Sequence, residues 1–426
     1  MLTKEQNEQL TRVGPGTPGG ELMRRYWHPI AAMEDLDTKF SVDVRLLGED
    51  LTLFRDRTGK LGLIGRYCPH RGASFTNGIP TEKGIRCPYH GWEYDAEGNC
   101  TEQPNEPKPF CDKVATKAYP VEELGGMIWA YMGPLPAPMT PHVDGLVHPG
   151  TIRMMGRAIV PVNWLQCQEN SLDPIHTEWL HGQMFQFVGE QRGVKVAIAT
   201  HHEKIAFKEF EYGITKHRVL AGHSEEEDDW TIGHPIFFPN WLSVGNGGEN
   251  TRYYAFQIRV PMDDENTLHV WYTAFVPPRG VDVLPHLTEK MYTYEVPWLD
   301  ENGDPLVDNV DGQDLMAWVS QGRIADRTSE NLGWSDQGIA AYRRMLMREI
   351  KKVQDGEEPM NVFRDPATHQ RIDLPNEKSK FHNSDGLRMW LNKTHMTYSP
   401  IRDDVIAMYE AVGAAGPQQR FANAAD

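Results

Sequence analysis

The sequence predicts an α+β protein in which an all-β N-terminal module is followed by a larger domain with an antiparallel sheet wrapped on a helix. Three observations predict this organisation. Between Ser41 and Tyr131, short runs alternate apolar and polar residues, which is typical of half-buried strands. From Gly133 to His142, four prolines in ten residues indicate a stiff linker. Beyond the linker, strand-like runs are mixed with segments of helical period.

Length, composition and charge limit the class of protein. With 426 residues, 39% hydrophobic and 24% charged, the chain can bury the cores of two or three domains. Its 43 basic and 60 acidic residues leave a net charge of −17, which argues against nucleic acid or an anionic membrane surface as a partner. The sequence opens on no apolar signal segment, no run approaches about 18 apolar residues, and its five cysteines are too few for a disulfide framework. We therefore expect a cytoplasmic protein.

The first 150 residues are expected to contain a lead-in, the β module and the linker. Residues 1–40 are predicted to be helical, with a break at Gly14-Pro15-Gly16 and a second short apolar helix around Leu22 and Tyr26. The β module is assigned to residues 41–135 and the proline-rich linker to residues 136–150.

The remaining residues, 151–426, are predicted to form the mixed domain. Asn163–His181 has the pattern of a helix, and Ser335-Asp336 is a candidate cap for another. The apolar face of that second helix is formed by Ile339, Tyr342, Leu346, Ile350 and Val353. Strand-like runs are predicted at Val194–Ala199, Ala206–Leu220, Tyr253–Val260 and His269–Val276.

Two short loops carry the strongest chemical signal. Cys68-Pro69-His70-Arg71-Gly72 is followed, after a gap of sixteen residues behind His70, by Cys87-Pro88-Tyr89-His90-Gly91-Trp92. Two thiolates and two imidazoles suit either a tetrahedral zinc ion or a two-iron cluster with cysteines on one iron and histidines on the other. Each loop supplies one cysteine and one histidine. This pairing favours the cluster, because zinc fingers usually group like ligands together.

The CPHRG and CPYHGW loops resemble those of the Rieske family residue by residue. The resemblance implies an N-terminal Rieske [2Fe-2S] domain with one cluster per chain. It further implies that Gly72 and Gly91 allow close approach of the backbone to the cluster, and that Trp92 shields it. The implied cluster ligands are Cys68, His70, Cys87 and His90.

A second set of metal-binding residue types lies between Glu169 and His181. His176 and His181 are five residues apart, a helical spacing only if the turn is slightly distorted. Two imidazoles and one carboxylate on one face of an iron ion leave positions open for O₂ and substrate. The pattern E-N-x-x-D-x-x-H-x₄-H resembles the signature of Rieske non-haem iron oxygenases, in which such a site follows a Rieske domain.

This second resemblance implies the rest of the catalytic site. The domain would have a helix-grip (START/Bet v 1-like) fold and hold one mononuclear Fe(II) per chain. Asp314, which precedes Ser320-Gln321-Gly322, is the implied third ligand, with Asp308 and Asp311 as competitors. Asp173 is expected to bridge His176 to a Rieske histidine of a neighbouring subunit, His70 or His90, in a head-to-tail ring. A helix N-cap is the alternative role for Asp173.

Several segments resemble the phthalate dioxygenase-like branch, among them the opening LTRVGPGTPGGELMRRYW and the stretch from Asp326 to Leu346. That branch implies homotrimers or hexamers that oxygenate aromatic carboxylates by cis-dihydroxylation in aromatic degradation, with O-demethylation or diaryl-ether cleavage as the alternative. The sequence has no G-x-G-x-x-G fingerprint, so we expect electrons from a separate NAD(P)H-dependent reductase with a flavin and a plant-type 2Fe-2S ferredoxin domain. Candidate contacts for a substrate carboxylate are Lys208, Lys216 and Arg218.

Two other classes of protein stay open on the sequence alone. One is an electron carrier with a ligand-binding sheet and no oxygenase chemistry, against which the pair of His176 and His181 argues. The other is a binding protein in which a structural zinc ion stabilises the fold. Iron content separates the first from an oxygenase, and the colour of the purified protein separates the second, because zinc sites are colourless.

Overall fold

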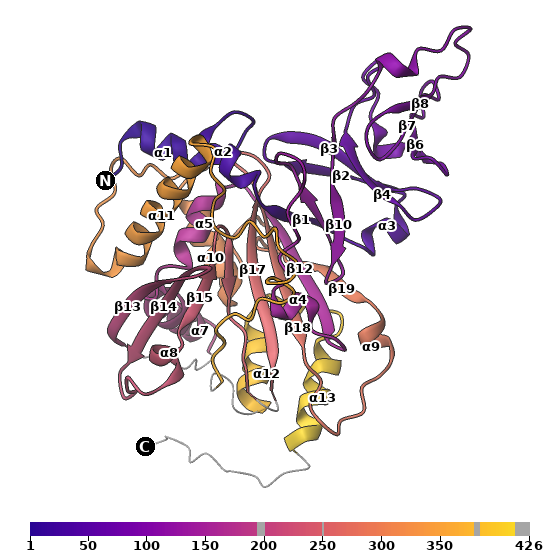
Figure 1. The fold of residues 1–426 in the computed structure, drawn as a ribbon. Coiled ribbons are helices and arrows are strands. Elements are labelled where there is room, and N and C mark those ends of the chain that lie inside the picture. Colours follow the sequence, from indigo (N-terminus) through magenta and orange to yellow (C-terminus); the bar gives the residue numbers. More distant parts are fainter. Residues whose placement is uncertain (194–200, 249–250, 379–383, 414–426) are drawn as a thin grey trace.

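The structure is a computed structural model that describes residues 1–193, 201–248, 251–378 and 384–413. The smaller, N-terminal part projects from one end of a large sheet in the C-terminal part (Figure 1). Two short helices near the N-terminus lie beside the sheet, and further helices lie along it. No helix among the described residues is long and apolar enough to cross a membrane.

The first segment is helical only in part. Thr3 caps α1 (Lys4–Thr11) through a capping box with Gln6, and Thr17 caps α2 (Pro18–Met23), which has proline at its first position. The expected continuation of helix to Tyr26 and beyond is wrong, because β1 (Trp27–Ala32) follows. Pro29 would interrupt a helix, but it is tolerated in β1, an edge strand with an irregular register at that point.

The strand β1 belongs to a three-stranded antiparallel sheet. It pairs with β11 (Met127–Tyr131), which also pairs with β10 (Val121–Leu124). All five residues of β11 are buried, so this sheet is part of the main core. It joins the N-terminal part firmly to the C-terminal one. The short helix α3 (Asp35–Thr38) follows β1, and Asp35 forms an ion pair with Arg157 of the large sheet.

The cluster-loop part contains two small antiparallel sheets. The first has the order β2-β3-β4-β9, and the second has the order β5-β6-β7-β8. The second sheet has its own core around Phe75, Ile85 and Tyr94. The strands of the two sheets are β2 (Ser41–Leu46), β3 (Glu49–Arg55), β4 (Leu61–Gly65), β9 (Ala118–Tyr119), β5 (Ile79–Pro80), β6 (Ile85–Arg86), β7 (Glu93–Tyr94) and β8 (Cys100–Glu102).

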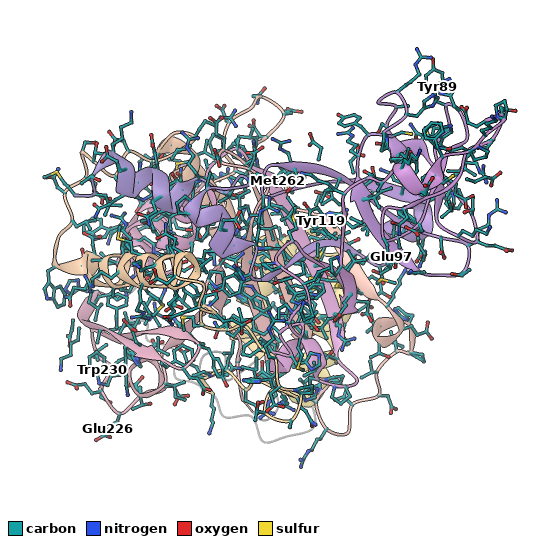
Figure 2. All side chains as sticks on the ribbon, turned by 45° about the horizontal axis from the view of Figure 1, so that its top comes forward. Tyr89, Glu97, Tyr119, Glu226, Trp230 and Met262 are labelled. Atoms are coloured by element: carbon teal, nitrogen blue, oxygen red, sulfur yellow. The ribbon has the colours of Figure 1, made fainter. Side chains whose placement is uncertain are left out.

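The β2–β3 turn anchors this part to the C-terminal domain. Leu47 and Gly48 both have positive φ, as a tight hairpin turn requires. Their amide N–H groups donate to the carbonyls of Pro261 at 3.0 Å and Met262 at 2.8 Å. Met262 lies where the two parts of the molecule meet (Figure 2).

The large sheet has eight strands in the order β13-β14-β15-β16-β17-β18-β12-β19, and all neighbours are antiparallel except β12 and β19. Strands at 253–260 and 269–276 were expected and are present. The run 206–220 is instead a hairpin, and the run 194–199 lies outside the described residues. The strands are β13 (His202–Phe210), β14 (Gly213–Leu220), β15 (His234–Phe237), β16 (Trp241–Ser243), β17 (Tyr253–Pro261), β18 (Thr267–Phe275), β12 (Ile152–Val160) and β19 (Met291–Glu295).

The two faces of this sheet have different neighbours. On β17, Phe256 and Ile258 point into the core shared with β1 and β11. Tyr253 and Ala255 point to the opposite face, where they pack with residues of α10 (Val310–Ser320) and α12 (Ser384–Lys393). The helices thus cover one face of a curved antiparallel sheet, which is the predicted α+β architecture.

Two further helices, in the linker region and after residue 336, contribute to the core on the opposite face of the sheet. The linker region contains α4 (Asp144–Val147), which packs on β17. The predicted amphipathic helix is α11 (Gln337–Gln354), which packs against α2. Asp336 occupies the N-cap position, as predicted, but its carboxylate accepts from Gly333 N–H and not from an N–H of the helix. Other short helices are α8 (Asp228–Thr231), α9 (His286–Glu289) and α13 (Arg402–Gly413).

Candidate metal centres

The two cysteine–histidine loops fold in the same way. In each, the N–H of the cysteine donates to the carbonyl five residues later, from Cys68 to Ala73 and from Cys87 to Trp92, both at 2.8 Å. In each, the glycine four residues after the cysteine donates back to the cysteine carbonyl, at 2.8 and 3.0 Å. This repeated turn places one cysteine and one histidine side by side on each loop.

The cysteines and the histidines of these loops differ in burial. Cys68 and Cys87 are both buried at 2% exposure, whereas His70 and His90 are partly exposed, with ring centroids 4.6 Å apart. Burial, and then the neighbouring Cys87, raises the pKa of Cys68 in the metal-free chain. Two buried thiols on one side and two surface imidazoles on the other fit the donor set of a Rieske cluster, whose irons would hold the sulfurs as thiolates.

The aromatic and glycine neighbours have separate roles. Trp92 is buried and stacks on His70, with centroids 4.3 Å apart and planes 5° apart. Gly72 has φ +72° and Gly91 has φ +78°, backbone conformations that favour glycine. Tyr89, between the second cysteine and histidine, lies at the outer tip of the N-terminal part (Figure 2).

The expected helix at 163–181 is broken near the catalytic histidines. The helix α5 (Trp164–Asn170) ends, α6 (His176–Glu178) begins after a turn, and the π-helical segment η3 (Trp179–Met184) continues into α7 (Phe185–Gln191). A π-helix forms hydrogen bonds between residues five apart and is wider than an α-helix, in which bonded residues are four apart. It therefore brings His176 and His181 to one side, with their ring centroids 5.1 Å apart.

Asp314 of α10 completes the group. Its Oδ1 lies 3.2 Å from His181 Nε2 and 3.8 Å from His176 Nε2, and one ligand atom from each residue lies within 4.8 Å of the others. His181 Nδ1 donates to Gln313 Oε1 at 2.9 Å, and His176 Nδ1 donates to the carbonyl of Asp173. Both Nε2 lone pairs are therefore available at the same point as the carboxylate, which fits a 2-His-1-carboxylate iron site.

The competing acids are engaged elsewhere. Asp311 accepts from Trp271 Nε1 at 2.7 Å and from the N–H of His395, and burial raises its pKa to about 6. Asp308 forms an ion pair with Arg192 at 2.8 Å. The structure therefore brings Asp314 to the histidines and keeps both competitors away from them.

In the metal-free chain the pKa values of His176, His181 and Asp314 shift in different directions. Burial lowers the pKa of His176 to about 3, so this imidazole is neutral at physiological pH. Burial also opposes the charge on His181, but the nearby Asp314 carboxylate outweighs burial and raises the pKa of His181. Burial raises the pKa of Asp314, but the two histidines outweigh it, so the pKa of Asp314 is lowered. The carboxylate is thus charged and ready to bind a cation.

Asp173 caps the turn before His176. Its Oδ1 accepts from the N–H of Ile175 at 2.8 Å and from that of His176 at 3.4 Å. Its Oδ2 lies 3.9 Å from His176 Nδ1. Capping was the alternative role for Asp173, and the same carboxylate also lies within reach of the histidine ring.

The structure explains two signature residues whose roles the sequence left open. Glu169 is buried and accepts from Arg327 at 2.7 Å and from Arg343 at 2.6 Å, and Arg343 also pairs with Glu330. Asn170 donates to Asp314 Oδ1 at 3.4 Å. This ion network ties α5, which leads into the histidine segment, to α11 and the stretch before it. All of these residues lie in quoted motifs, but sequence alone does not show that they meet.

A cavity of about 250 Å³ opens beside the three ligand residues, between the large sheet and the helices. Lys216 and Arg218 of β14 line it together with His176, His181 and Asp314. Lys216 is buried at 6% exposure, and Arg218 is paired with Asp229 at 3.2 Å. The third candidate cation is not brought to the cavity: Lys208 is exposed on β13.

Asp229 also belongs to a second group of metal-binding residue types. His234 Nε2 lies 3.7 Å from Asp229 Oδ1 and contacts the buried Glu377. The Arg218 guanidinium lies against the same aspartate, so the group contains a cation of its own. The arrangement fits a salt-bridged support for Arg218 at the edge of the cavity.

Comparisons with known proteins agree with this geometry. The Rieske [2Fe-2S] domain model matches residues 26–120, and the model described as LigXa C-terminal domain like matches residues 300–373. The 5,5'-dehydrodivanillate O-demethylase oxygenase subunit of Sphingobium sp. (strain NBRC 103272 / SYK-6) is 45% identical over 88% of this chain and 87% of that protein. The phthalate 4,5-dioxygenase oxygenase subunit of Pseudomonas putida is 30% identical over 84% of this chain and 88% of its own length.

A solved structure supports the fold. The terminal oxygenase of carbazole 1,9a-dioxygenase from Novosphingobium sp. KA1 has a TM-score of 0.57 at 20% identity, over 82% of this chain and 96% of that one. Similarity to the two relatives above extends through both metal-binding parts of the chain. The chain therefore belongs to the Rieske non-haem iron oxygenases, in the phthalate dioxygenase-like branch, as an oxygenase subunit that carries a Rieske 2Fe-2S cluster and a mononuclear iron.

Proposed function

We propose that this oxygenase removes the methyl group of a methoxylated aromatic acid. Ring dihydroxylation was the first expectation from the sequence, with O-demethylation as the alternative. The 45% identical relative is described as an O-demethylase, whereas the phthalate dioxygenase is 30% identical, and this difference favours the alternative. The observation that carries the proposal is the cavity itself, which joins the three candidate iron ligands to a wall with two basic residues.

The cavity suits an anionic aromatic ring. Trp271 of the sheet and Trp390 of α12 supply aromatic surface. Lys216 and Arg218 supply positive charge from the neighbouring part of the sheet, on the same side as the iron ligands. A largely apolar site with a few placed charges is the usual way in which proteins bind and orient a small aromatic acid.

The chain's own residues would hold and orient the reacting centre. We assign the mononuclear iron to His176, His181 and Asp314, and the cluster to Cys68, His70, Cys87 and His90. The iron, when bound, supplies the activation of O₂. The carbonyl of Asp173 and the amide of Gln313 fix the two imidazole rings, and the helices over the sheet exclude bulk water. Asn170 donates to Asp314 and keeps one carboxylate oxygen in place.

The two metal centres of one chain lie in separate parts of the molecule. The cluster loops belong to the projecting N-terminal part, whereas the candidate iron ligands are carried by α6, η3 and α10 beside the large sheet (Figure 1). We propose that the working enzyme is a head-to-tail trimer, or a hexamer of two trimers, in which Asp173 of one subunit lies against His70 or His90 of the next. The partial exposure of both Rieske histidines supports this arrangement.

The reaction needs two electrons from outside the chain. We propose that a separate NAD(P)H-dependent reductase, with a flavin and a plant-type 2Fe-2S ferredoxin domain, supplies them in the cytoplasm. The balance is one methoxyarene, one O₂, two electrons and two protons giving one phenol, one formaldehyde and one water. Neither the described cavity nor the cluster loops need a further cofactor for this balance.

The test is a turnover assay with a compatible reductase. The substrates are 5,5'-dehydrodivanillate, 3-methoxybenzoate and phthalate, and the measurements are O₂ uptake, formaldehyde and ring products. We expect one formaldehyde per O₂ consumed with a methoxylated acid. A cis-diol from phthalate without formaldehyde from either methoxylated acid would contradict this and favour the second candidate, ring dihydroxylation, which similarity to the phthalate dioxygenase supports.

A further inference from the structure

Gln257 interrupts an otherwise apolar strip of the cavity wall. It lies on β17, directly opposite Leu242 on β16 and Trp271 on β18. All three residues line the cavity beside the candidate iron ligands. Because directly opposed residues of antiparallel strands point to the same face, the strip presents one polar side chain between two apolar ones.

A buried cation fixes the orientation of this amide. Arg259, two residues further along β17, is fully buried, and its Nη2 donates to Gln257 Oε1 at 2.6 Å. A guanidinium carries only hydrogen-bond donors, so the atom that faces it must be the amide oxygen. The amide cannot flip without placing its own N–H groups against those of Arg259. The amide nitrogen is therefore turned away from Arg259.

Arg259 is itself held on several sides. Its Nη1 donates to the carbonyl of Gln257 at 3.2 Å and to Gln168 Oε1 at 3.5 Å. Its guanidinium lies 5.9 Å from the centre of the Trp318 ring on α10, the helix that also carries Asp314. Burial lowers the pKa of Arg259 to about 10, which leaves the side chain protonated at neutral pH. The acceptor side of Gln257 is thus permanently occupied.

The donor side of Gln257 has no partner among the described residues. Among residues 1–193, 201–248, 251–378 and 384–413, none accepts a hydrogen bond from Gln257 Nε2. The side chain is only partly buried and lines the cavity. A ligand oxygen that lacks a proton, such as a carboxylate or an ether oxygen, is the natural partner for two N–H groups held in this way.

The basic residues lie at a different place in the cavity wall. Lys216 and Arg218 are on β14, and β15 and β16 lie between that strand and β17. Three strand spacings of about 4.8 Å give a separation of roughly 14 Å. The cations of β14 and the amide of Gln257 would therefore contact different parts of one bound molecule.

We propose that Gln257 determines substrate specificity by donating a hydrogen bond to an acceptor oxygen of the bound aromatic molecule, and that Arg259 acts through it as a positioning residue. The inference rests on the proposed function in one respect, which is that the bound molecule is a methoxylated aromatic acid. The acceptor is either the methoxy oxygen or a carboxylate oxygen.

The test measures binding without turnover. Dissociation constants are measured without O₂ for 3-methoxybenzoate, for 3-ethylbenzoate, which lacks the ether oxygen, and for 3-methoxytoluene, which lacks the carboxylate. The variant Gln257→Met removes the donor at similar length. Gln257→Glu keeps an acceptor for Arg259 but replaces the donor with a carboxylate oxygen. Gln168→Met is the matched control, because it removes another acceptor of Arg259 without changing the cavity wall.

We expect Gln257→Met and Gln257→Glu to weaken 3-methoxybenzoate binding by about tenfold or more. One of the other two ligands should be weakened less, and it identifies the oxygen. A spared 3-ethylbenzoate indicates the ether oxygen, and a spared 3-methoxytoluene indicates the carboxylate. A purely structural role of Gln257 would weaken the binding of all three ligands equally. Gln168→Met shows how large such an unselective effect is. Equal weakening of all three ligands in the Gln257 variants would overturn the proposal.

The binding result and the proposed function can fail separately. If the selective weakening appears but wild-type enzyme releases no formaldehyde from methoxylated acids, the demethylase proposal is wrong and the role of Gln257 stands. If formaldehyde is released and neither variant of Gln257 changes the relative affinities, the role of Gln257 is wrong and the demethylase proposal stands.

Discussion

The two metal centres of this chain are built in opposite ways. The four candidate cluster ligands come from two loops of a few residues each, and both loops are closed by the same short-range backbone hydrogen bonds. The three candidate iron ligands come from a broken helix and from α10, and Asp314 follows His181 by 133 positions. The first centre depends on local turns, and the second depends on the packing of helices over a sheet.

Burial differs between the two centres in the direction that their tasks require. His70 and His90 are partly exposed on loops of the N-terminal part, so another protein chain can reach them. Asp314 is buried and His176 is partly buried, with 15% of its side chain exposed, and both line a cavity where charges interact strongly. A surface centre suits electron transfer between chains, and an enclosed one suits oxygen chemistry on a bound substrate.

The largest expected effect is loss of activity when the enclosed centre alone is changed. His181→Ala removes one imidazole, so we expect the mononuclear iron to be lost and O₂-dependent product formation to fall by orders of magnitude. The visible absorption of the cluster should stay at the wild-type level, because that centre has its own core. Metal analysis and turnover check this. Near wild-type activity in the variant would rule out His181 as a ligand.

The reciprocal change affects the exposed centre alone. Cys87→Ser should bleach the cluster absorption and stop reductase-driven turnover, while the mononuclear iron and the cooperative unfolding of the large domain remain. Cys167→Ser is the matched control, since Cys167 is buried within α5 and belongs to neither ligand set. A Cys87→Ser protein that keeps the cluster spectrum would show that the assignment of the loop is wrong.

A smaller effect concerns the stability of the enclosed centre. Glu169→Gln leaves Arg327 and Arg343 buried without their full counter-charge, and such a change costs about 3–5 kcal/mol. Burial raises the pKa of Glu169, but the two arginines outweigh it, so the folded pKa lies below the usual value of 4.5. The contribution of Glu169 is therefore complete above pH 4.5 and is lost as pH falls through the folded pKa.

Thermal unfolding of wild type and Glu169→Gln at several pH values measures this. The difference in stability should be constant near neutral pH and should shrink as the solution becomes strongly acidic. A difference that grows on acidification would mean that Glu169 is neutral in the folded protein.

The smallest expected effect tests the local turn of the first cluster loop. Gly72 has φ +72° with open space around it, so Gly72→Ala should cost about 1–2 kcal/mol from backbone strain alone. Gly150→Ala is the matched control, with φ +67° and equally open space in a loop far from the cluster ligands in sequence. Only Gly72→Ala should speed loss of the cluster on mild heating. Equal loss in both variants would argue against a role for this turn.

The contrast between the centres also explains what the sequence could predict. The candidate cluster ligands lie within two short motifs, so their residue types and spacing indicated a metal site, and resemblance to the Rieske family implied their roles. Asp314 lies on another element, and only resemblance to a known family separated it from Asp308 and Asp311. The structure shows the physical distinction, because Asp311 accepts from Trp271 and Asp308 pairs with Arg192.

The sequence could not predict which basic residues line the cavity, because that depends on strand register. Lys208 pairs with Thr215, whereas Lys216 pairs with Phe207, so the two lysines point to opposite faces of the sheet. Sequence alternation showed that both lay on strands but could not show which face meets the helices. The strand β1 was also missed, because its short apolar run directly follows two helical segments and was predicted to be part of the helical lead-in.

The central claim is that His176, His181 and Asp314 hold an iron separate from the cluster, and iron content per chain tests it most directly. Wild-type protein should contain three irons, two in the cluster and one at this site. Asp314→Ala should contain two with an unchanged cluster spectrum, and Asp311→Asn should keep three, because Asp311 bonds to Trp271 and to the backbone of His395 instead. Three irons in Asp314→Ala, or two in Asp311→Asn, would contradict the assignment.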